Sequence, residues 1–529
     1  MVRESFFRRY LLFLGLVFAL SLTLHLTGVV YAVLQNHKLS GVNPLEGEVL
    51  YFTISPDGRY TVFVGDLIER GKYDLFSVTT TGGERVTLSD DLPSDCDVYR
   101  YFVSPNSEIV VFSAVTSTRE TCGLFSIPIA GGTPIELHPR ETGFVLRDIN
   151  ITFNNENVIY IVEQDIDPAQ STIYRVPIGG GDSDLLSYVC EGELDYQITP
   201  DSLHVVFRYY STTGVSQLKR STMDGAQEEL LFSDNHISRF TVSPDGAYII
   251  YLEKIGLWNE LFSIPIGGGH PKGLNGELVA GGEVIDYKVA PNSEYVVYKA
   301  DETTIDQNLL YQAPVDGSTT GTQLIPPVMV DPNENVSSFF ISPNSQWVVY
   351  KGDFRENERF ELFSISMTDG VNYPLTSLII PNGDVGVYQI TPNSLGVVFI
   401  ADRLTDEVNE LFGVFINGTG IRPLNDTLPD GGEVNCFKIS PNSLGVIYCA
   451  DQDEYGVSNL YAIPTLRTPG VMPLKVNPDL ILGGDVVCAF EITPDNKGVI
   501  YIADQEDDHV MELFVTYDYY VAFIPMVVK

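Results

Sequence analysis

The sequence has few of the residues from which nucleic-acid surfaces and metal sites are built. Its 529 residues include 7 His and 2 Trp, and 31 basic residues stand against 70 acidic ones, a formal net charge of −39. A surplus of this sign excludes generic nucleic-acid binding and disfavours adsorption to anionic lipid. Solubility, or adaptation to a salty medium, is the simplest interpretation of the acidic surplus.

Catalytic motifs are missing as well. The sequence has no HExxH, no pair of His at metal-ligand spacing, no GxSxG and no P-loop. A pair of carboxylates that could cleave a glycosidic bond has no such motif. Acidic residues occur throughout the chain, and the distance between two carboxyl groups in the fold is not readable from the sequence. We therefore expect a non-enzymatic protein, with a divergent polysaccharide hydrolase or lyase as one alternative.

Long hydrophobic runs are missing after the N-terminus. Residues 1–32 join a basic start to the apolar run LLFLGLVFALSLTLHLTGVV, and Val30-Tyr31-Ala32 fits a signal-peptide cleavage site. The run is long enough that an uncleaved membrane anchor is the alternative. In both cases we predict an extracytoplasmic protein, secreted, periplasmic or at the cell surface, with membrane contact only through an uncleaved N-terminal segment.

A repeat is what the sequence has in abundance. ITPNSLGVVFIAD begins at Ile390, and ISPNSLGVIYCAD begins at Ile439. The shared core is Ser/Thr-Pro-Asp/Asn-Gly/Ser followed by an apolar run. Ten copies follow one another at intervals of 44 to 53 residues. They place Pro56, Pro105, Phe153 (in a degenerate copy), Pro200, Pro244, Pro291, Pro343, Pro392, Pro441 and Pro494 at the turn.

Each copy is typical of four short strands. The first ends at the proline, the second is the apolar run, the third reads ELFSIPI or similar, and the fourth precedes a Gly-rich loop. Pro and Asp or Asn favour a hairpin turn between the first two. Ser replaces Gly in several of these turns, so we expect that position not to require positive φ. The second strand is apolar at consecutive residues, 397–400 for example, which predicts burial of both its faces.

Four antiparallel strands per unit of roughly 45 residues predict an all-β protein, a β-propeller of four-stranded antiparallel blades. The repeat resembles those of the TolB family and of the dipeptidyl-peptidase N-terminal domain, which combine a Ser-Pro-Asp-Gly turn with a Leu/Ile-Phe/Tyr strand. SPDG is intact at Ser55–Gly58 and Ser243–Gly246. The resemblance covers almost the whole chain after the N-terminus and implies the fold, whereas this repeat serves many functions.

The two ends of the chain bear on ring closure. HKLSGVNPLEGEVLYF, near the N-terminus, matches the fourth strand and loop of a repeat, while the tenth repeat ends soon after ELFVTY. We therefore predict one ten-bladed ring, residues 33–517, closed by an N-terminal strand. Two smaller propellers are the alternative. A rival closure uses residues 518–529 as a last strand instead of a tail.

The six cysteines agree with an oxidising compartment. Cys96 and Cys122 belong to one repeat and one face, which predicts a disulfide. Cys436 and Cys449 are equidistant from a PNS turn and form a second predicted pair, although Cys488 competes as a partner. Buried free thiols are the alternative for these later cysteines.

Acidic residues concentrate in the loops between the second and third strands and before the first strand. In a four-stranded meander these loops share one face. We expect binding through loops of this acidic face, with Glu283, Glu433, Asp485, Asp402 and Asp504 as candidates, or through contacts of the ring itself. Asp451 and Asp453 in DQDEYG are candidate Ca²⁺ ligands, and a solvated acidic loop is the alternative.

These observations predict an exported module that binds or scaffolds protein or polysaccharide at the cell exterior, without nucleic acid. Self-assembly into a surface layer or fibre is an alternative.

Overall fold

The computed structural model describes residues 34–517, except for 44–45, 165, 167–168, 212–213, 235, 326–333, 356–357, 377–379, 381–382, 466 and 468–469. The predicted N-terminal segment and residues 518–529 lie outside the described residues. Every element in the described part is a strand, and this part contains no helix that could cross a membrane.

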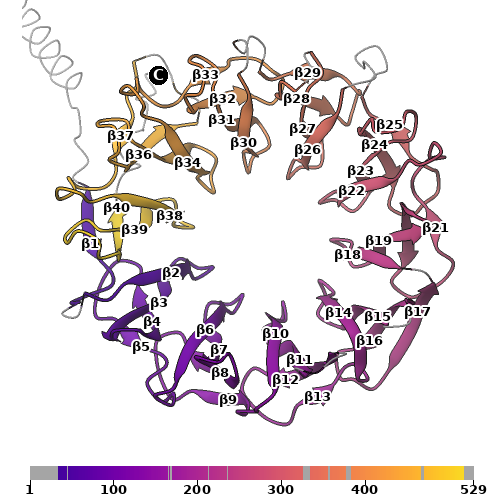
Figure 1. The fold of residues 1–529 in the computed structure, drawn as a ribbon, viewed down its shortest axis with the longest axis horizontal. Coiled ribbons are helices and arrows are strands. Elements are labelled where there is room, and N and C mark those ends of the chain that lie inside the picture. The colour runs from indigo at the N-terminus through magenta and orange to yellow at the C-terminus, as the bar shows by residue number, and fades with distance from the viewer. Residues whose placement is uncertain are drawn as a thin grey trace, which may run out of the picture.

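The strands form consecutive four-stranded antiparallel sheets, which Figure 1 shows side by side around a central opening. We call each four-stranded unit a blade. Eight blades are separate sheets, and blades 3 and 4 form one sheet of eight strands through the pairs Gln170–Glu191 and Ser171–Cys190. The prediction of an all-β propeller is confirmed.

The innermost strands surround the opening. From blade 1 to blade 10 they are β2 (Val49–Ile54), β6 (Cys96–Val103), β10 (Phe144–Ile151), β14 (Cys190–Ile198), β18 (Ile237–Val242), β22 (Val284–Val289), β26 (Val336–Ile341), β30 (Val385–Ile390), β34 (Val434–Ile439) and β38 (Val486–Ile492).

The second strands are β3 (Tyr60–Glu69), β7 (Ile109–Thr116), β11 (Asn157–Gln164), β15 (His204–Ser211), β19 (Tyr248–Ile255), β23 (Tyr295–Ala300), β27 (Trp347–Gly352), β31 (Gly396–Ala401), β35 (Gly445–Ala450) and β39 (Gly498–Ala503). The third strands are β4 (Lys72–Thr79), β8 (Thr121–Pro128), β12 (Gln170–Pro177), β16 (Ser216–Thr222), β20 (Trp258–Pro265), β24 (Leu309–Pro314), β28 (Glu361–Ser366), β32 (Glu410–Phe415), β36 (Asn459–Pro464) and β40 (Glu512–Tyr517).

The outer strands are short. They are β5 (Val86–Thr87), β9 (Ile135–His138), β13 (Asp184–Leu185), β17 (Glu228–Asp234), β21 (Lys272–Gly273), β25 (Thr322–Gln323), β29 (Asn372–Pro374), β33 (Arg422–Pro423) and β37 (Leu474–Lys475). In blade 10 this place is taken by β1 (Gln35–Lys38), from the other end of the chain.

The core lies between neighbouring blades. Every residue of β31, β35 and β39 is buried, as the unbroken apolar runs predict. Nine blades also stack an aromatic residue of the second strand on one of the third, such as Tyr448 on Tyr461 with ring centroids 5.4 Å apart. Cross-strand aromatic pairs of this kind stabilise a sheet beyond the area that they bury.

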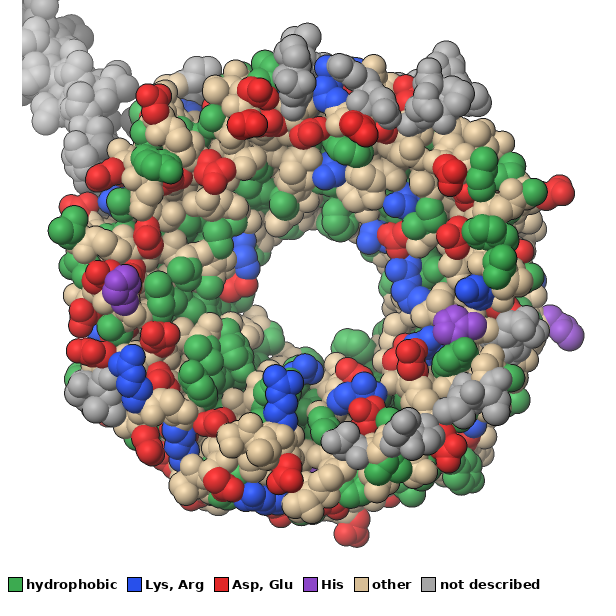
Figure 2. Space-filling model, in the orientation of Figure 1, with side chains coloured by type: hydrophobic (Ala, Val, Ile, Leu, Met, Phe, Trp, Pro, Cys, Tyr) green, Lys and Arg blue, Asp and Glu red, His purple; other side chains and the backbone are tan. Residues whose placement is uncertain are grey.

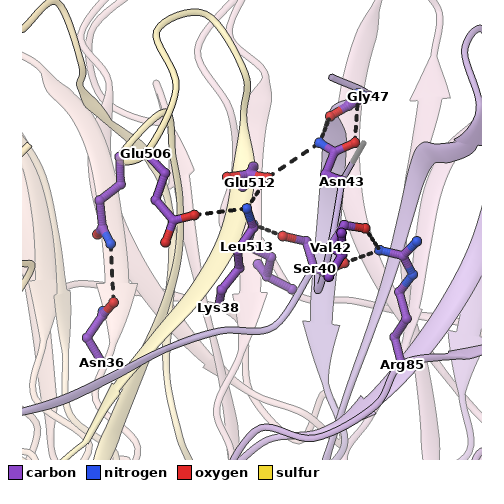
Figure 3. A network of polar contacts seen from close by, with 11 residues as sticks. Asn36, Lys38, Ser40, Val42, Asn43, Gly47, Arg85, Glu506, Glu512 and Leu513 are labelled. Atoms are coloured by element: carbon purple, nitrogen blue, oxygen red, sulfur yellow. Dashed lines mark hydrogen bonds and ion pairs between the residues drawn. The ribbon is translucent and has the colours of Figure 1, made fainter. Parts of the chain in front are cut away.

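The N-terminal strand joins the last blade. Gln35 to Lys38 of β1 pair antiparallel with Tyr517 to Phe514 of β40. Figure 3 shows the polar contacts at this junction. The Lys38 ammonium lies 2.5 Å from the buried Glu512 carboxylate and 3.0 Å from Glu506, and the Leu39 amide donates to the Leu513 carbonyl at 2.7 Å. Residues far apart in sequence therefore complete one blade, as the matching terminal segments predict.

The turns between first and second strands differ from expectation. The residue after Asp or Asn has positive φ in all ten blades, whether it is Gly, Ser or Asn, and Ser443 for example has φ 66°. The expectation that serine marks a position without this requirement is wrong. The residues are Gly58, Ser107, Asn155, Ser202, Gly246, Ser293, Ser345, Ser394, Ser443 and Asn496.

A bond between blades explains the serines. The Ser443 hydroxyl accepts a hydrogen bond, at 2.9 Å, from the Asn393 amide in the turn of the preceding blade. Equivalent bonds reach the side chains of Ser107, Asn155, Ser202, Ser293, Ser345, Ser394 and Asn496. Gly58 and Gly246 have no side chain to accept one. Serine thus tolerates a conformation that favours glycine because its hydroxyl links two blades.

This link is open to a simple test. We expect Ser443→Ala to lower the free energy of unfolding by about 1–2 kcal/mol, because the Asn393 amide loses its acceptor while the positive φ remains. Ser443→Asn should stay within about 0.5 kcal/mol of the parent, since Asn496 makes the same bond in blade 10. Chemical denaturation measures both. Equal losses in the two variants would contradict a role for the side-chain oxygen.

Candidate functional site: the central channel

The inner strands share an irregularity in their pairing with the second strands. Nine of the ten contain a register shift against the second strand, β14 being the exception. In β2, Val49 pairs with Gly65 and Tyr51 with Val64, so Leu50 is the extra residue of a β-bulge. Tyr99 and Ile285 hold the same place in β6 and β22. Bulges bend a strand and redirect side chains.

These strands expose large apolar side chains. The exposed set is Leu50, Tyr51, Tyr99, Ile285, Phe340 and Val387, from 39% to 60% exposed. Because they lie on the innermost strands, we call them, together with Arg100 and Lys288, the channel wall. Figure 2 shows apolar and basic side chains, with some acidic ones, around the open centre.

Two cations of the channel wall lie over aromatic rings. The Arg100 guanidinium is 5.1 Å from the Tyr99 ring centroid. The Lys288 ammonium is 5.1 Å from the ring of Phe340 in the next blade. Neither cation belongs to a salt bridge among the residues that the structure describes. Both are therefore free to attract an anionic group.

Two other cations of the inner strands form ion pairs with acidic residues of the next blade. Arg239 pairs with Asp286 across blades 5 and 6 at 2.8 Å, and Lys438 pairs with Glu491 across blades 9 and 10. Lys299 and Lys351, on second strands, donate to inner-strand carbonyls of the next blade, and burial lowers the pKa of both. The inner strands carry seven acidic and five basic residues, a smaller acidic excess than the 70 to 31 of the whole chain.

Buried tyrosines of the inner strands contact the preceding blade. The Tyr287 hydroxyl donates to the Ile250 carbonyl of blade 5 at 3.0 Å, and the Tyr388 hydroxyl lies 3.2 Å from that of Ser338 in blade 7. Burial raises the pKa of both phenols. These two side chains are buried between blades and connect them, so they do not belong to the channel wall.

The candidate residues Asp402, Asp504 and Asp451 follow second strands and hydrogen bond to backbone amides. Asp451 accepts from the Glu433 amide at 2.7 Å with one oxygen and from the Gly456 amide at 3.2 Å with the other. The Asp504 carboxylate accepts hydrogen bonds from the backbone amides of Asp485 and His509, and the Asp402 carboxylate accepts one from the backbone amide of Asp384. Asp66, Asp301 and Asp353 make equivalent contacts. In these six blades, 1 and 6 to 10, the bonds join the two loops of the acidic face, which lie side by side as predicted.

The candidates Glu283, Glu433 and Asp485 contact the preceding blade. Glu283 accepts from the Asn259 amide side chain at 2.9 Å, Glu433 from that of Asn409 at 2.8 Å, and Asp485 from the Ser458 backbone amide at 2.8 Å. Carboxylates of the acidic face thus connect loops within and between blades. Their role in binding a ligand stays a prediction.

The two candidate Ca²⁺ ligands differ in their surroundings. Both oxygens of Asp451 already accept backbone hydrogen bonds, whereas Asp453 is exposed and lies 3.9 Å from the Lys475 ammonium. Within the described part of the chain, three-residue clusters that could hold a metal are Cys436, Cys449 and Cys488, and Asp504, Asp508 and His509. Neither Asp451 nor Asp453 belongs to one.

The cysteines form two disulfides. Cys96 and Cys122 are bonded, as predicted, and join the first and third strands of blade 2. The predicted Cys436–Cys449 pairing is wrong, because Cys436 is bonded to Cys488. The two bonded cysteines lie on neighbouring inner strands, which approach each other beside the opening, with Cα atoms 6.1 Å apart. Cys449 faces Cys436 in the ladder and is a buried free thiol, as is Cys190.

A second hollow of about 990 Å³ lies away from the channel, against loops of blades 8 and 9. Arg422 and Arg467 line it, but Arg422 donates to the Arg467 carbonyl at 2.6 Å and Arg467 to the Asn425 carbonyl at 2.8 Å. Their guanidinium groups support the loops, so the channel wall offers the better candidate site.

The channel wall was not predicted from the sequence. A signal for it exists, since exposed residues occupy positions three, five and six before the turn proline, as Phe340, Arg100 and Leu50 do. These positions differ in type from repeat to repeat, so no single motif reports them.

Comparison with known proteins finds no matching family model and no matching curated protein. Among solved structures, the chain is similar to prolyl endopeptidase (12% identity, TM-score 0.40, 69% of this chain and 56% of that one) and to Porphyromonas gingivalis dipeptidyl peptidase 4 (9%, 0.46, 66% and 57%). It is also similar to a protein described as TolB from Agrobacterium tumefaciens (13%, 0.28, 55% and 94%). The chain spans a little over half the length of the two peptidases. The described part of the chain is an all-strand, propeller-like fold.

Proposed function

We propose that this chain is an exported, non-enzymatic binding or scaffold module whose central channel receives a protein or polysaccharide ligand that carries carboxylates beside apolar surface. The observation that carries the proposal is the unpaired Arg100 and Lys288 beside exposed aromatic rings, in a molecule with a net charge of −39. Few basic residues are available, and these two are not used in ion pairs of the fold.

The chemistry of the wall favours this ligand class. A guanidinium fork binds a carboxylate through two parallel hydrogen bonds, and an ammonium binds it as a point charge. Exposed rings of Tyr51, Tyr99 and Phe340 offer flat apolar faces for a sugar ring or an apolar side chain. The wall residues belong to paired strands, which hold them in place before a ligand arrives.

The non-enzymatic part of the proposal rests on the absent catalytic motifs, and export rests on the N-terminal segment together with the two disulfides. Incubation with polygalacturonate, followed by assay of new reducing ends, distinguishes a binding module from a hydrolase or lyase. Release of reducing ends would favour the enzymatic alternative.

We expect binding to depend on the two cations of the wall. Calorimetry with polygalacturonate and with poly-glutamate should show that Arg100→Ala and Lys288→Ala each weaken binding about 5- to 10-fold, because each removes one charge-assisted contact worth about 1–1.5 kcal/mol. Neutral dextran tests the requirement for carboxylates.

Lys254→Ala is the matched control, because it removes an exposed cation at the far end of a second strand, away from the wall. It should bind as the parent does. Equal weakening in all three variants would indicate general attraction of a polyanion, and unchanged binding in the wall variants would contradict the proposal.

Self-assembly into a layer or fibre remains the alternative proposal. Light scattering on the chain from Val33, with and without Ca²⁺ and with and without the last ten residues, separates the two. Assembly that needs the metal or the tail would favour it, and a monomer under all conditions would contradict it.

A further inference from the structure

Three sulfur atoms meet beside the opening. Cys436 on β34 and Cys488 on β38 form the disulfide between blades 9 and 10, and Cys449 on β35 is the ladder partner of Cys436. All three Sγ atoms lie within 4.8 Å of one another. Cys449 is buried, whereas Cys488 is exposed. A free thiol thus lies close to both sulfur atoms of a disulfide.

We propose that Cys436, Cys449 and Cys488 form a thiol–disulfide exchange site that releases Cys488 as a reactive thiol at the channel. The Cys449 thiolate attacks Sγ of Cys436, the Cys436–Cys449 bond forms, and the bond to Cys488 breaks with its electron pair leaving on Cys488. The proton lost from Cys449 is balanced by protonation of Cys488, so no external oxidant or reductant takes part.

The exchange changes what the disulfide does. The observed bond joins two blades, and the product bond joins two strands of blade 9. Because Cys488 lies on an inner strand and is exposed, its thiolate can then attack an external disulfide and hold one half of it as a mixed disulfide. The chemical class of co-reactant is therefore a small or protein-borne disulfide that enters the channel.

The surroundings of Cys449 indicate a slow reaction at neutral pH. Burial raises the pKa of the Cys449 thiol to about 12, and its sulfur donates to the Val486 carbonyl at 3.4 Å. The carboxylates of Asp451 and Asp485 face it from the adjoining loops, beside the polar groups of Ser458 and Asn435. The attacking species is the thiolate, so alkaline conditions should accelerate the exchange.

Labelling with 5,5′-dithiobis(2-nitrobenzoate) tests the proposal in the Cys190→Ser background, which removes the other free thiol. After incubation at pH 9.5, we expect one label per chain, on Cys488, and peptide mapping should find Cys436 bonded to Cys449. Cys449→Ala should reduce labelling at Cys488 at least tenfold. A label on Cys449 with the Cys436–Cys488 bond intact, or no label at Cys488, would overturn the proposal.

A second variant tests the product geometry. In Cys488→Ser, mild oxidation with oxidised glutathione should join Cys436 to Cys449, since they are opposed in the ladder. Failure to form this bond in a protein with the parent circular dichroism spectrum would overturn the exchange, because its product would then be inaccessible.

Discussion

Lys38→Met is expected to lower the free energy of unfolding by about 3–5 kcal/mol, because it leaves the Glu512 carboxylate buried without its cation. Glu512 is 3% exposed at its side chain, and Lys38 is its cationic partner. Figure 3 shows that this pair lies where β1 meets β40, so its loss weakens the junction between the two ends of the chain. Urea denaturation measures the effect.

A double variant distinguishes the loss of the Lys38–Glu512 ion pair from other effects of replacing Lys38. Lys38→Met with Glu512→Gln should recover most of the loss, because no unpaired buried charge remains. Glu506→Gln, which removes the exposed partner of Lys38, should cost no more than about 0.5 kcal/mol. A double variant as unstable as Lys38→Met would show that the ion pair does not explain the loss.

The pair also predicts a dependence on pH. Burial alone would lower the pKa of Lys38, but hydrogen bonds and charges of Glu512 and Glu506 raise it above its ordinary value of 10.5. A cation with a raised pKa stabilises the fold fully below its unfolded pKa, and this contribution is lost as pH rises through the folded value. The difference between parent and Lys38→Met should therefore be constant near neutrality and shrink above about pH 10.5.

The second large effect is expected at Asp451. We expect Asp451→Ala to destabilise the protein by about 2–4 kcal/mol, because the amides of Glu433 and Gly456 lose a shared charged acceptor. Asp451→Asn should cost less, since one acceptor oxygen remains. Thermal and urea unfolding check both variants.

Asp453→Ala is the control, because Asp453 lies two residues away and is exposed; it should change stability by less than about 0.5 kcal/mol. Repeating the measurements in Ca²⁺ and in chelator tests whether Asp451 and Asp453 are Ca²⁺ ligands. We expect the loss in Asp451→Ala to be the same in both. A stabilisation by Ca²⁺ that disappears in both Asp451→Ala and Asp453→Ala would instead establish a Ca²⁺ site.

The sequence by itself determined the architecture. Turn residues at intervals of 44 to 53 and unbroken apolar runs are local signals, and each reports on the strand or hairpin that contains it. The pairing of β1 with β40 was predictable because the segment near the N-terminus repeats the fourth-strand pattern. The Cys96–Cys122 bond joins strands of one blade, so the repeat pattern was enough to suggest it.

Only the tertiary structure decided which side chains meet between blades. Cys436 bonds with Cys488 rather than Cys449, Ser443 accepts the Asn393 amide, and Glu433 contacts Asn409 of the preceding blade. Cys436 and Cys488, for example, are 52 residues apart in the chain. Spacing in a repeat shows that two residues occupy similar places in their blades. The twist of the sheets and the approach of the inner strands at the channel determine whether their side chains touch, because these set the distance between neighbouring blades.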